Sequence, residues 1–340
     1  MTGIAAQPVF THLLRMTDHR GTFEHADLSD PRREHGYCTD DMARLLVVAT
    51  REPESSGEVN GLAGKALTFL NDAQSYDGTC RNRCNVGGHW TDTPNTDDHW
   101  GRMVWGLGTA AAHSDVSMVR RLATIQFERA AKARSPHPRA SAFAAIGAAE
   151  LLGVTPGHVE ARQLLTDYAA SLGAPSGDTE WPWPEPRLTY ANAVLAEAMI
   201  ATGVALEDSV LRQRGLDLLE WLLEVETIDG HLSPTPVDGR GPGDPQPAFD
   251  QQPIEVASLA DACARASVTD PRALWPEAIL SAAAWFQGNN DLGLLMWDPE
   301  TGGGFDGLHA DRVNLNQGAE STLAVISTMQ QARRFSPVPQ

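Results

Sequence analysis

The chain has 340 residues, and 42% of them are hydrophobic, which is enough to bury a sizeable core. Its 44 acidic residues against 26 Lys and Arg give a formal charge of −18, which argues against nucleic acid and anionic membrane surfaces as partners. No uncharged apolar run reaches the roughly 18 residues of a membrane span. The first residues also lack the charged and apolar regions of a secretory signal. We therefore expect a cytoplasmic protein that does not enter a membrane.

Apolar residues recur with a helical period along the whole chain. Helices are predicted over residues 3–16, 38–52, 60–75, 96–113, 116–134, 138–153, 156–172, 188–203, 206–226, 252–267, 271–287 and 317–333. Long alternating runs of Val, Ile, Thr and Tyr are absent, so any strands should be short ribbons within loops. The sequence thus predicts an all-α protein of about twelve helices.

The predicted helices come in pairs, in which a helix with a polar start follows a long loop and its partner follows a short one. The 280 residues from Asp40 to Glu320 divide into five steps of 56, so six such hairpins fit the chain. The proline-rich stretches 174–187 and 229–251 must be loops, yet helical pairing continues on both sides of each. We therefore expect residues 1–340 to form a single domain.

Carboxylates gather at the starts of several predicted helices. Asp40 and Asp41 follow Thr39, and a second adjacent pair, Asp97 and Asp98, follows Thr96. A helix start needs one capping or dipole-stabilising group, so a second carboxylate in each pair is available for another role. Two further carboxylates open later helices, namely Glu255 and Glu320. Acidic groups at the same end of several packed helices would converge on one cavity.

Amide and aromatic side chains accompany these carboxylates. Together they could bind sugar hydroxyls by hydrogen bonds and the C–H faces of a sugar ring by stacking. The residues expected to bind substrate are Asp40, Asp41, His99, Arg102, Trp181, Trp183, Tyr190, Asn192, Asp250, Gln251, Gln252, Asp306 and Asn316. Trp181 and Trp183, in a proline-rich loop, are the preferred candidates for stacking on a sugar.

Motifs of other chemistries are missing. The sequence has no dinucleotide-binding or Walker glycine motif, no H-E-x-x-H and no G-x-S-x-G. The four cysteines, Cys38, Cys80, Cys84 and Cys263, do not complete a zinc site at their spacing. We expect free thiols, no metal and no cofactor.

Eight segments, in this order along the chain, resemble a bacterial family of six-hairpin (α/α)6 proteins. The segments are HLLRMTDHRGTFEHA, HGYCTDDMAR, DDHWGRMVWGLG, LTYANAVLAEAM, GHLSP, FDQQPIEVASLADAC, NDLGLLMWDPETGGGFDGL and NLNQGAESTLA. Members of the family occur alone or fused behind glycosyltransferases, and they are described as glycosyltransferase- or glycosidase-like. The resemblance implies an (α/α)6 toroid and a functional link to a glycosyltransferase. The chain departs from the family pattern at Asp97-Asp98-His99, where the family has an acidic-Asp-Ser-His run, and at Ala191, where the family has Asp.

The residues and the resemblance together predict an enzyme that acts on an oligosaccharide or other glycoside, by hydrolysis. Two well-separated carboxyl groups, about 6.5–9.5 Å apart, would favour inversion of the anomeric centre. Asp98 or Asp97 would be the general acid, and Glu320 or Glu255 the general base. One alternative is a sugar isomerase or epimerase, which would use histidines such as His99 and His309. The other is a non-catalytic glycan-binding module that serves a glycosyltransferase.

Overall fold

The computed structural model describes residues 7–53 and 55–335. Within these residues twelve α-helices occur, which confirms the predicted all-α architecture. Their bounds are α1 Thr11–Met16, α2 Thr39–Arg51, α3 Gly57–Ala73, α4 Asp98–His113, α5 Ser117–Ala130, α6 Pro138–Val154, α7 Val159–Ser171, α8 Ala193–Ala205, α9 Ser209–Val225, α10 Pro253–Thr269, α11 Leu274–Phe286 and α12 Ala319–Arg333.

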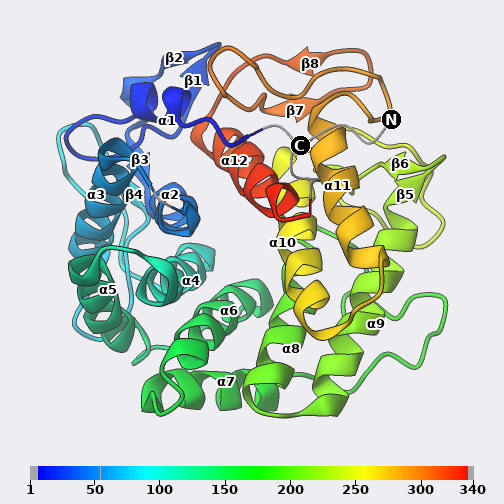
Figure 1. Ribbon diagram of the computed structural model, residues 1–340, viewed down its shortest axis with the longest axis horizontal. Coiled ribbons are helices and arrows are strands. Elements are labelled where there is room, and N and C mark those ends of the chain that lie inside the picture. The colour runs from blue at the N-terminus through cyan, green and yellow to red at the C-terminus, as the bar shows by residue number, and fades with distance from the viewer. Residues whose placement is uncertain (1–6, 54, 336–340) are drawn as a thin grey trace, which may run out of the picture.

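The helices form two concentric rings (Figure 1). The inner ring consists of α2, α4, α6, α8, α10 and α12, each in contact with the next, and α12 returns to α2 and closes the ring. Helices α3, α5, α7, α9 and α11 each pack on the outer side of the inner helix that precedes them, and α1 packs on α12. The chain therefore folds as an (α/α)6 toroid.

The pattern of apolar residues in a helix explains whether it lies in the inner or the outer ring. The outer helix α5 buries Val119, Ala123 and Phe127 at helical spacing, as expected for one apolar stripe. The inner helix α8 is instead buried on all sides from Ala193 to Gly203. Such crowding requires small side chains, and Ala and Gly are frequent in α6 and α8.

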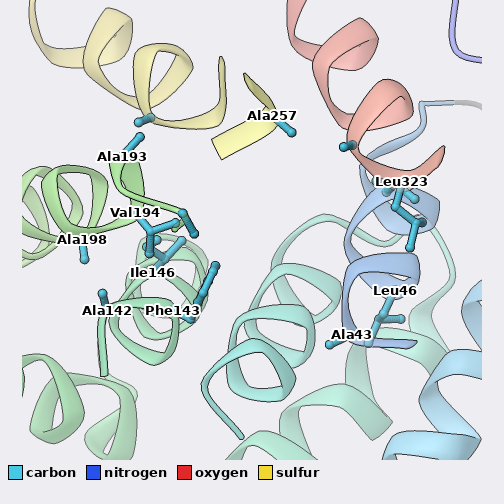
Figure 2. Close-up of a cluster of buried hydrophobic side chains, with 14 of the residues drawn as sticks. Ala43, Leu46, Ala142, Phe143, Ile146, Ala193, Val194, Ala198, Ala257 and Leu323 are labelled. Atoms are coloured by element: carbon cyan, nitrogen blue, oxygen red, sulfur yellow. The ribbon is translucent and has the colours of Figure 1, made fainter. Parts of the chain in front are cut away.

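The axis of the inner ring is filled by apolar side chains. Figure 2 shows part of this cluster, with Leu46 of α2, Phe143 of α6, Val194 of α8 and Leu323 of α12 among its members. A cavity of only about 30 Å³ remains on the axis, which suffices for a water molecule or two but not for a sugar ring. The two mouths of the toroid are therefore separate spaces.

Short ribbons connect the loops at the mouth where the inner helices begin. Four antiparallel pairs of two-residue strands occur among the described residues: β1 Ala26–Asp27 with β2 Asp30–Pro31, β3 Tyr37–Cys38 with β4 Arg83–Cys84, β5 Thr227–Ile228 with β6 His231–Leu232, and β7 Gly307–Leu308 with β8 Val313–Asn314. Strand β3 leads directly into α2, and its partner β4 lies in the loop before α4. This pairing joins the segment before α2 to the loop that precedes α4. The expectation of short ribbons within loops is confirmed.

Two predicted helices start too early. Residues 3–6 of the first lie outside the described residues, and residues 7–10 are not helical, so α1 begins at Thr11. The helix predicted from residue 188 begins only at Ala193, because Leu188 pairs with Arg240 and Ala191 has a positive φ of 45°. The other helices start and end within four residues of their predicted bounds.

Two further expectations concern the whole chain. All four cysteines are free, as predicted, and all four are buried. In the part of the chain that the structure describes, no helix has the length and apolarity needed to cross a bilayer.

Candidate active site

Two neighbouring cavities lie at the mouth where the inner helices begin. The first, which we call the α2–α4 cavity, has a volume of about 510 Å³ and is lined by Asp40, Asp98 and His99 among others. The second, the α2–α12 cavity, has about 360 Å³ and is lined by Asp40, Asp41 and Glu320 among others. Asp40 and Arg83 line both cavities, so the two adjoin at these side chains. We call the pair of cavities the cleft.

A larger cavity of about 630 Å³ lies at the opposite mouth, where the inner helices end. Its buried carboxylates are already paired with arginines: Arg265 binds Glu150 and Glu197, and Arg51 binds Asp261. These ion pairs leave none of the three carboxylates free to react. The cleft is therefore the better candidate for chemistry.

Asp98 is the carboxylate in the cleft that is free to react. It is the first residue of α4, and its half-buried side chain has no hydrogen bond or ion pair with any residue that the structure describes. Burial raises the pKa of Asp98, with Arg102 opposing and Asp40 adding to this effect. A raised pKa favours the protonated form, which can donate a proton to a ligand in the cavity.

Asp40, in contrast, is held in its ionised form. Its carboxylate accepts a hydrogen bond from Arg102 Nη1 at 2.7 Å and another from Asn82 Nδ2 at 2.9 Å. Burial alone would raise the pKa of Asp40, but the nearby guanidinium groups of Arg102 and Arg44 outweigh burial and lower it. Asp40 thus presents a fixed negative charge at the junction of the two cavities.

Arg44 links the starts of α2 and α12 through two carboxylates. Its Nη1 donates to Asp41 at 2.6 Å and its Nη2 to Glu320 at 2.5 Å. Asp41 is buried, and burial raises its pKa to about 7 although Arg44 opposes the shift. Glu320 is 43% exposed, so its carboxylate is accessible to a ligand or to water in the α2–α12 cavity. Arg44 therefore positions an accessible carboxylate in the cavity that adjoins the one lined by Asp98.

Glu255 has a different environment, although it also lies in the first turn of a helix. Its buried carboxylate accepts hydrogen bonds from the backbone N–H groups of Ala191 and Asn192 and from Asn192 Nδ2. Burial, together with the nearby Glu226, raises the pKa of Glu255 to about 8. Glu255 lines neither cavity of the cleft. It holds the segment before α8 against the start of α10.

Arg102 and Arg139 enclose the ring of Tyr190. The Arg102 guanidinium lies 5.8 Å from the ring centroid of Tyr190, and that of Arg139 lies 5.1 Å from it. Arg139 also binds Glu185 with two hydrogen bonds of 2.8 Å. Arg102, Tyr190 and Asn192, which the sequence predicts to bind substrate, line neither cavity of the cleft.

The two tryptophans predicted to stack on sugar pack instead on the outer helix α9. Trp183 is 2% exposed and stacks on Trp221, with ring centroids 5.8 Å apart. Trp181 meets the same Trp221 edge-on at 5.0 Å and donates its indole N–H to the Glu185 carbonyl. Neither lines the cleft, and a ring that is 2% exposed has no face available for a ligand.

Of the amide and acidic side chains just before α10, one lines the cleft and the others bind residues of the protein. Gln252 lines the α2–α12 cavity, whereas Gln251 is fully buried and donates to Asp291. Asp250 pairs with His309 at 2.6 Å and lies outside both cavities. Gln252 is thus the only one of the predicted trio Asp250, Gln251 and Gln252 in the described cleft lining.

Near α12, Asp306 lines the α2–α12 cavity and accepts the N–H of Gly318 at 2.9 Å. Burial raises the pKa of Asp306. Asn316 accepts the backbone N–H of Leu28 at 3.0 Å and lines neither cavity.

Near α4, Asp97 and His99 both line the α2–α4 cavity. Asp97 is exposed and lies 3.2 Å from His137, and the buried His99 binds the Cys80 carbonyl at 3.0 Å.

Sequence reasoning missed several cleft residues that come from loops. Glu24 and Arg83 form an ion pair in the α2–α12 cavity, and Asp92 accepts the backbone N–H groups of Asn82 and Arg83. None of these residues lies at a helix start. The pairing of β3 with β4 brings Arg83 to the cleft, and two-residue strands leave no recognisable pattern in a sequence.

One group of potential metal ligands lies in the cleft. Atoms of Glu24, Cys38 and Asp41 lie within 4.8 Å of one another. Burial raises the pKa of the Cys38 thiol well above its ordinary value, whereas a metal-bound cysteine is a thiolate. Without a bound cation, this environment favours the neutral thiol of Cys38.

No protein-family model matches the chain, and no curated protein matches it. Several solved structures share its fold. A sugar epimerase from a ruminal bacterium has a TM-score of 0.71 at 12% identity, covering 97% of both chains. A D-mannose isomerase has a TM-score of 0.68 at 12% identity, covering 96% of this chain and 94% of that one. A GH76A α-1,6-mannanase from Salegentibacter sp. has a TM-score of 0.66 at 11% identity, covering 96% and 97%.

At these identities the comparisons establish the fold alone. They place the fold of the chain among (α/α)6 toroids, which agrees with the fold that the sequence resemblance implied.

Proposed function

We propose that the protein is a carbohydrate-active enzyme that hydrolyses a glycoside in the cleft. The observation that carries this proposal is Asp98, an unpaired carboxyl with a raised pKa, next to the ionised Asp40 and across from the accessible Glu320. Glycoside hydrolysis commonly needs one protonated and one ionised carboxyl group, which different surroundings must keep apart in pKa. The cleft offers both environments.

In this proposal Asp98 protonates the glycosidic oxygen, and Glu320 activates the attacking water from the α2–α12 cavity. Arg44 holds Glu320 in place, and Asp40 accepts hydrogen bonds from substrate hydroxyls. A separation of about 6.5–9.5 Å between the Asp98 and Glu320 carboxyl groups would make the reaction an inverting one. Asp97 and Glu255 are weaker candidates, since Asp97 is exposed beside His137 and Glu255 is buried behind the cleft.

The neighbours in fold support carbohydrate chemistry. One solved structure is described as an inactive α-1,6-mannanase, altered to alanine at two adjacent aspartates and bound to α-1,6-mannotetrose. The present chain has two adjacent pairs of aspartates at helix starts, Asp40-Asp41 and Asp97-Asp98, and one member of each pair carries a specific role in this proposal.

A sugar epimerase or isomerase is the second candidate, because other neighbours in fold carry those descriptions. Such a reaction needs an acid–base pair close to one carbon atom, typically including histidine. The structure favours this candidate less, because His99 is buried against the Cys80 carbonyl and His309 binds Asp250 outside the cleft. A glycan-binding module serving a glycosyltransferase remains the third possibility.

Product analysis on a panel of neutral oligosaccharides, including α-1,6-mannotetraose and cellobiose, separates the three. We expect new reducing ends. The proton NMR spectrum should show that the first product has the anomeric configuration opposite to that of the cleaved bond. A changed sugar at a constant number of reducing ends would instead identify an epimerase. Saturable binding without any product would identify a binding module and overturn the proposal.

A further inference from the structure

We propose that the cleft accepts saccharides whose bound rings are uncharged, and that it excludes rings that carry a carboxylate or a sulfate. This inference rests on the proposed function and specifies its substrate class. The selectivity for uncharged rings follows from which charged side chains of the cleft are paired with one another and which are not.

Each guanidinium group in or directly behind the cleft is already neutralised by a carboxylate. Arg44 binds Asp41 and Glu320, and Arg102 binds Asp40. The remaining two pairs are Arg83 with Glu24 and Arg139 with Glu185. An anionic sugar needs a free guanidinium or ammonium group as a counter-ion, because a desolvated charge is costly unless it is paired.

The histidines do not supply that counter-ion either. His25 lies 3.7 Å from Glu24 in the α2–α12 cavity, and His137 lies 3.2 Å from Asp97 in the α2–α4 cavity. Each of these rings therefore already lies beside a carboxylate of the protein.

Carboxylates, in contrast, are in excess in the cleft. Asp92 accepts hydrogen bonds only from uncharged backbone N–H groups, and the exposed Asp97 lines the α2–α4 cavity with no arginine among the described residues bound to it. These groups create a negative potential that repels an anion from the moment of approach, and the formal charge of −18 acts in the same direction.

A cationic sugar is also disfavoured, for a different reason. An ammonium group bound near Asp98 would stabilise the ionised form of this carboxyl and deprive the enzyme of its proton donor. An uncharged ring avoids both effects, because its hydroxyl groups can donate to the excess carboxylates.

The Glu24–Arg83 pair is the point at which this selectivity can be changed. Arg83 lines both cavities, and Glu24 is the carboxylate that neutralises it. Glu24→Gln keeps the size of the side chain but leaves the guanidinium group of Arg83 without an anionic partner. This variant should therefore tolerate an anionic ring better than the parent protein does.

The test compares the neutral oligosaccharide that is turned over fastest with the same compound oxidised to a carboxylate at a C6 whose hydroxyl is free. We expect the parent protein to prefer the neutral compound by about 100-fold or more in kcat/KM, since unfavourable charge contacts cost several tenfold factors. In Glu24→Gln this preference should shrink at least about tenfold. Asp244→Asn is the matched control, because it removes the partner of Arg187 outside the cleft and should leave the preference unchanged.

Calorimetric binding of both compounds to Asp98→Asn gives a second readout that does not need turnover. Cleavage or binding of the oxidised compound within threefold of the neutral one would overturn this inference and leave the hydrolase proposal intact. An unchanged preference in Glu24→Gln would also contradict it. A protein that neither cleaves nor binds any saccharide would overturn the proposed function itself.

Discussion

Adjacent residues at the start of α4 have very different surroundings. Asp97 points to solvent beside His137, while Asp98 lies half-buried in the α2–α4 cavity with no partner among the described residues. Both side chains line this cavity, but Asp97 is the exposed residue before the helix, whereas Asp98 is the first residue of the helix. The same division separates Asp40 from Asp41 at the start of α2, where Asp41 is the more deeply buried.

This difference yields the first prediction. Asp98→Asn should lower kcat by about 10²- to 10⁴-fold on the identified glycoside, because an amide cannot donate the proton that a carboxyl donates. The dissociation constant of the substrate should change little. Asp97→Asn is the control, since its carboxylate is exposed, and it should retain activity within a few-fold of the parent. Equal losses in the two variants would contradict the assignment of the proton donor.

The pH dependence of the same reaction gives a second prediction. The raised pKa of Asp98 means that the proton donor is lost only above the ordinary range of an aspartate, near 3.9. Activity should therefore persist through mildly acidic pH and fall on the alkaline side as Asp98 ionises. Measurement of kcat/KM against pH checks this. The residual activity of Asp98→Asn should no longer fall at alkaline pH. If kcat/KM of this variant still fell as it does in the parent protein, a group other than Asp98 would cause the decline.

The sequence located part of the cleft and missed the rest for identifiable reasons. Asp40, Asp41, Asp98 and Glu320 were accessible to prediction because helix starts have local signals and packed helices start at a common end. Glu255 has the same local signal, but its role depends on the N–H groups of a segment about 64 residues away. No local pattern distinguishes the two cases. The cavity-lining loop residue Glu24 is equally invisible, since only tertiary contacts bring it to Arg83.

Helix–helix contacts in the inner ring depend on glycines at which two backbones meet. A Cβ atom on Gly108 of α4 would lie 2.0 Å from the carbonyl oxygen of Gly147 in α6. A Cβ atom on Gly61 of α3 would meet nothing within 4 Å. The same substitution should therefore have opposite effects in the two rings.

The third prediction compares these two glycines. Gly108→Ala should lower the free energy of unfolding by about 1–3 kcal/mol or more, because α4 and α6 must separate. Gly61→Ala should raise it by up to about 1 kcal/mol, because alanine is the better helix former at an exposed site. Urea unfolding of both variants measures the difference. Stabilisation by Gly108→Ala would show that the inner helices do not pack as closely as described.

At the scale of the elements, helical periodicity predicted nearly all of the architecture. Inner and outer helices differ in how many of their faces are apolar, and this is visible in the sequence. The start of α8 was misjudged because apolar and aromatic residues continue into the preceding loop, whose backbone turns at Ala191. The packing of Trp181 and Trp183 could not be predicted, because a proline-rich loop does not reveal which neighbour it packs on, and here that neighbour is α9.

The whole molecule buries acidic groups whose protons stabilise the fold, and this sets the fourth prediction. Burial raises the pKa of Asp41 to about 7 and that of Glu255 to about 8, against about 3.9 and 4.3 in an unfolded chain. Between these values the folded protein keeps protons that the unfolded chain has released. The stabilisation is complete below the unfolded values and is lost as the pH rises through the folded ones.

The free energy of unfolding should therefore fall from pH 6.5 to pH 8.5, by up to about 1.4 kcal/mol per pH unit for each retained proton. The buried His12, whose pKa burial lowers, acts in the opposite direction but only below about 6.5. Denaturant titrations at several pH values test this. Asp41→Asn should give a shallower decline, and a stability that increases with pH over this range would refute the prediction.

The contact of α12 with α2 joins the last helix of the chain to the first helix of the inner ring. During synthesis the ribosome delivers residues 319–333 after all the other helices, so until then the growing polypeptide has an open seam. The apolar sides of α2 and α10 that α12 will cover stay exposed along this seam, and exposed surfaces of this kind promote aggregation. Because Glu320 arrives with the same helix, completion of the fold and completion of the cleft are one event.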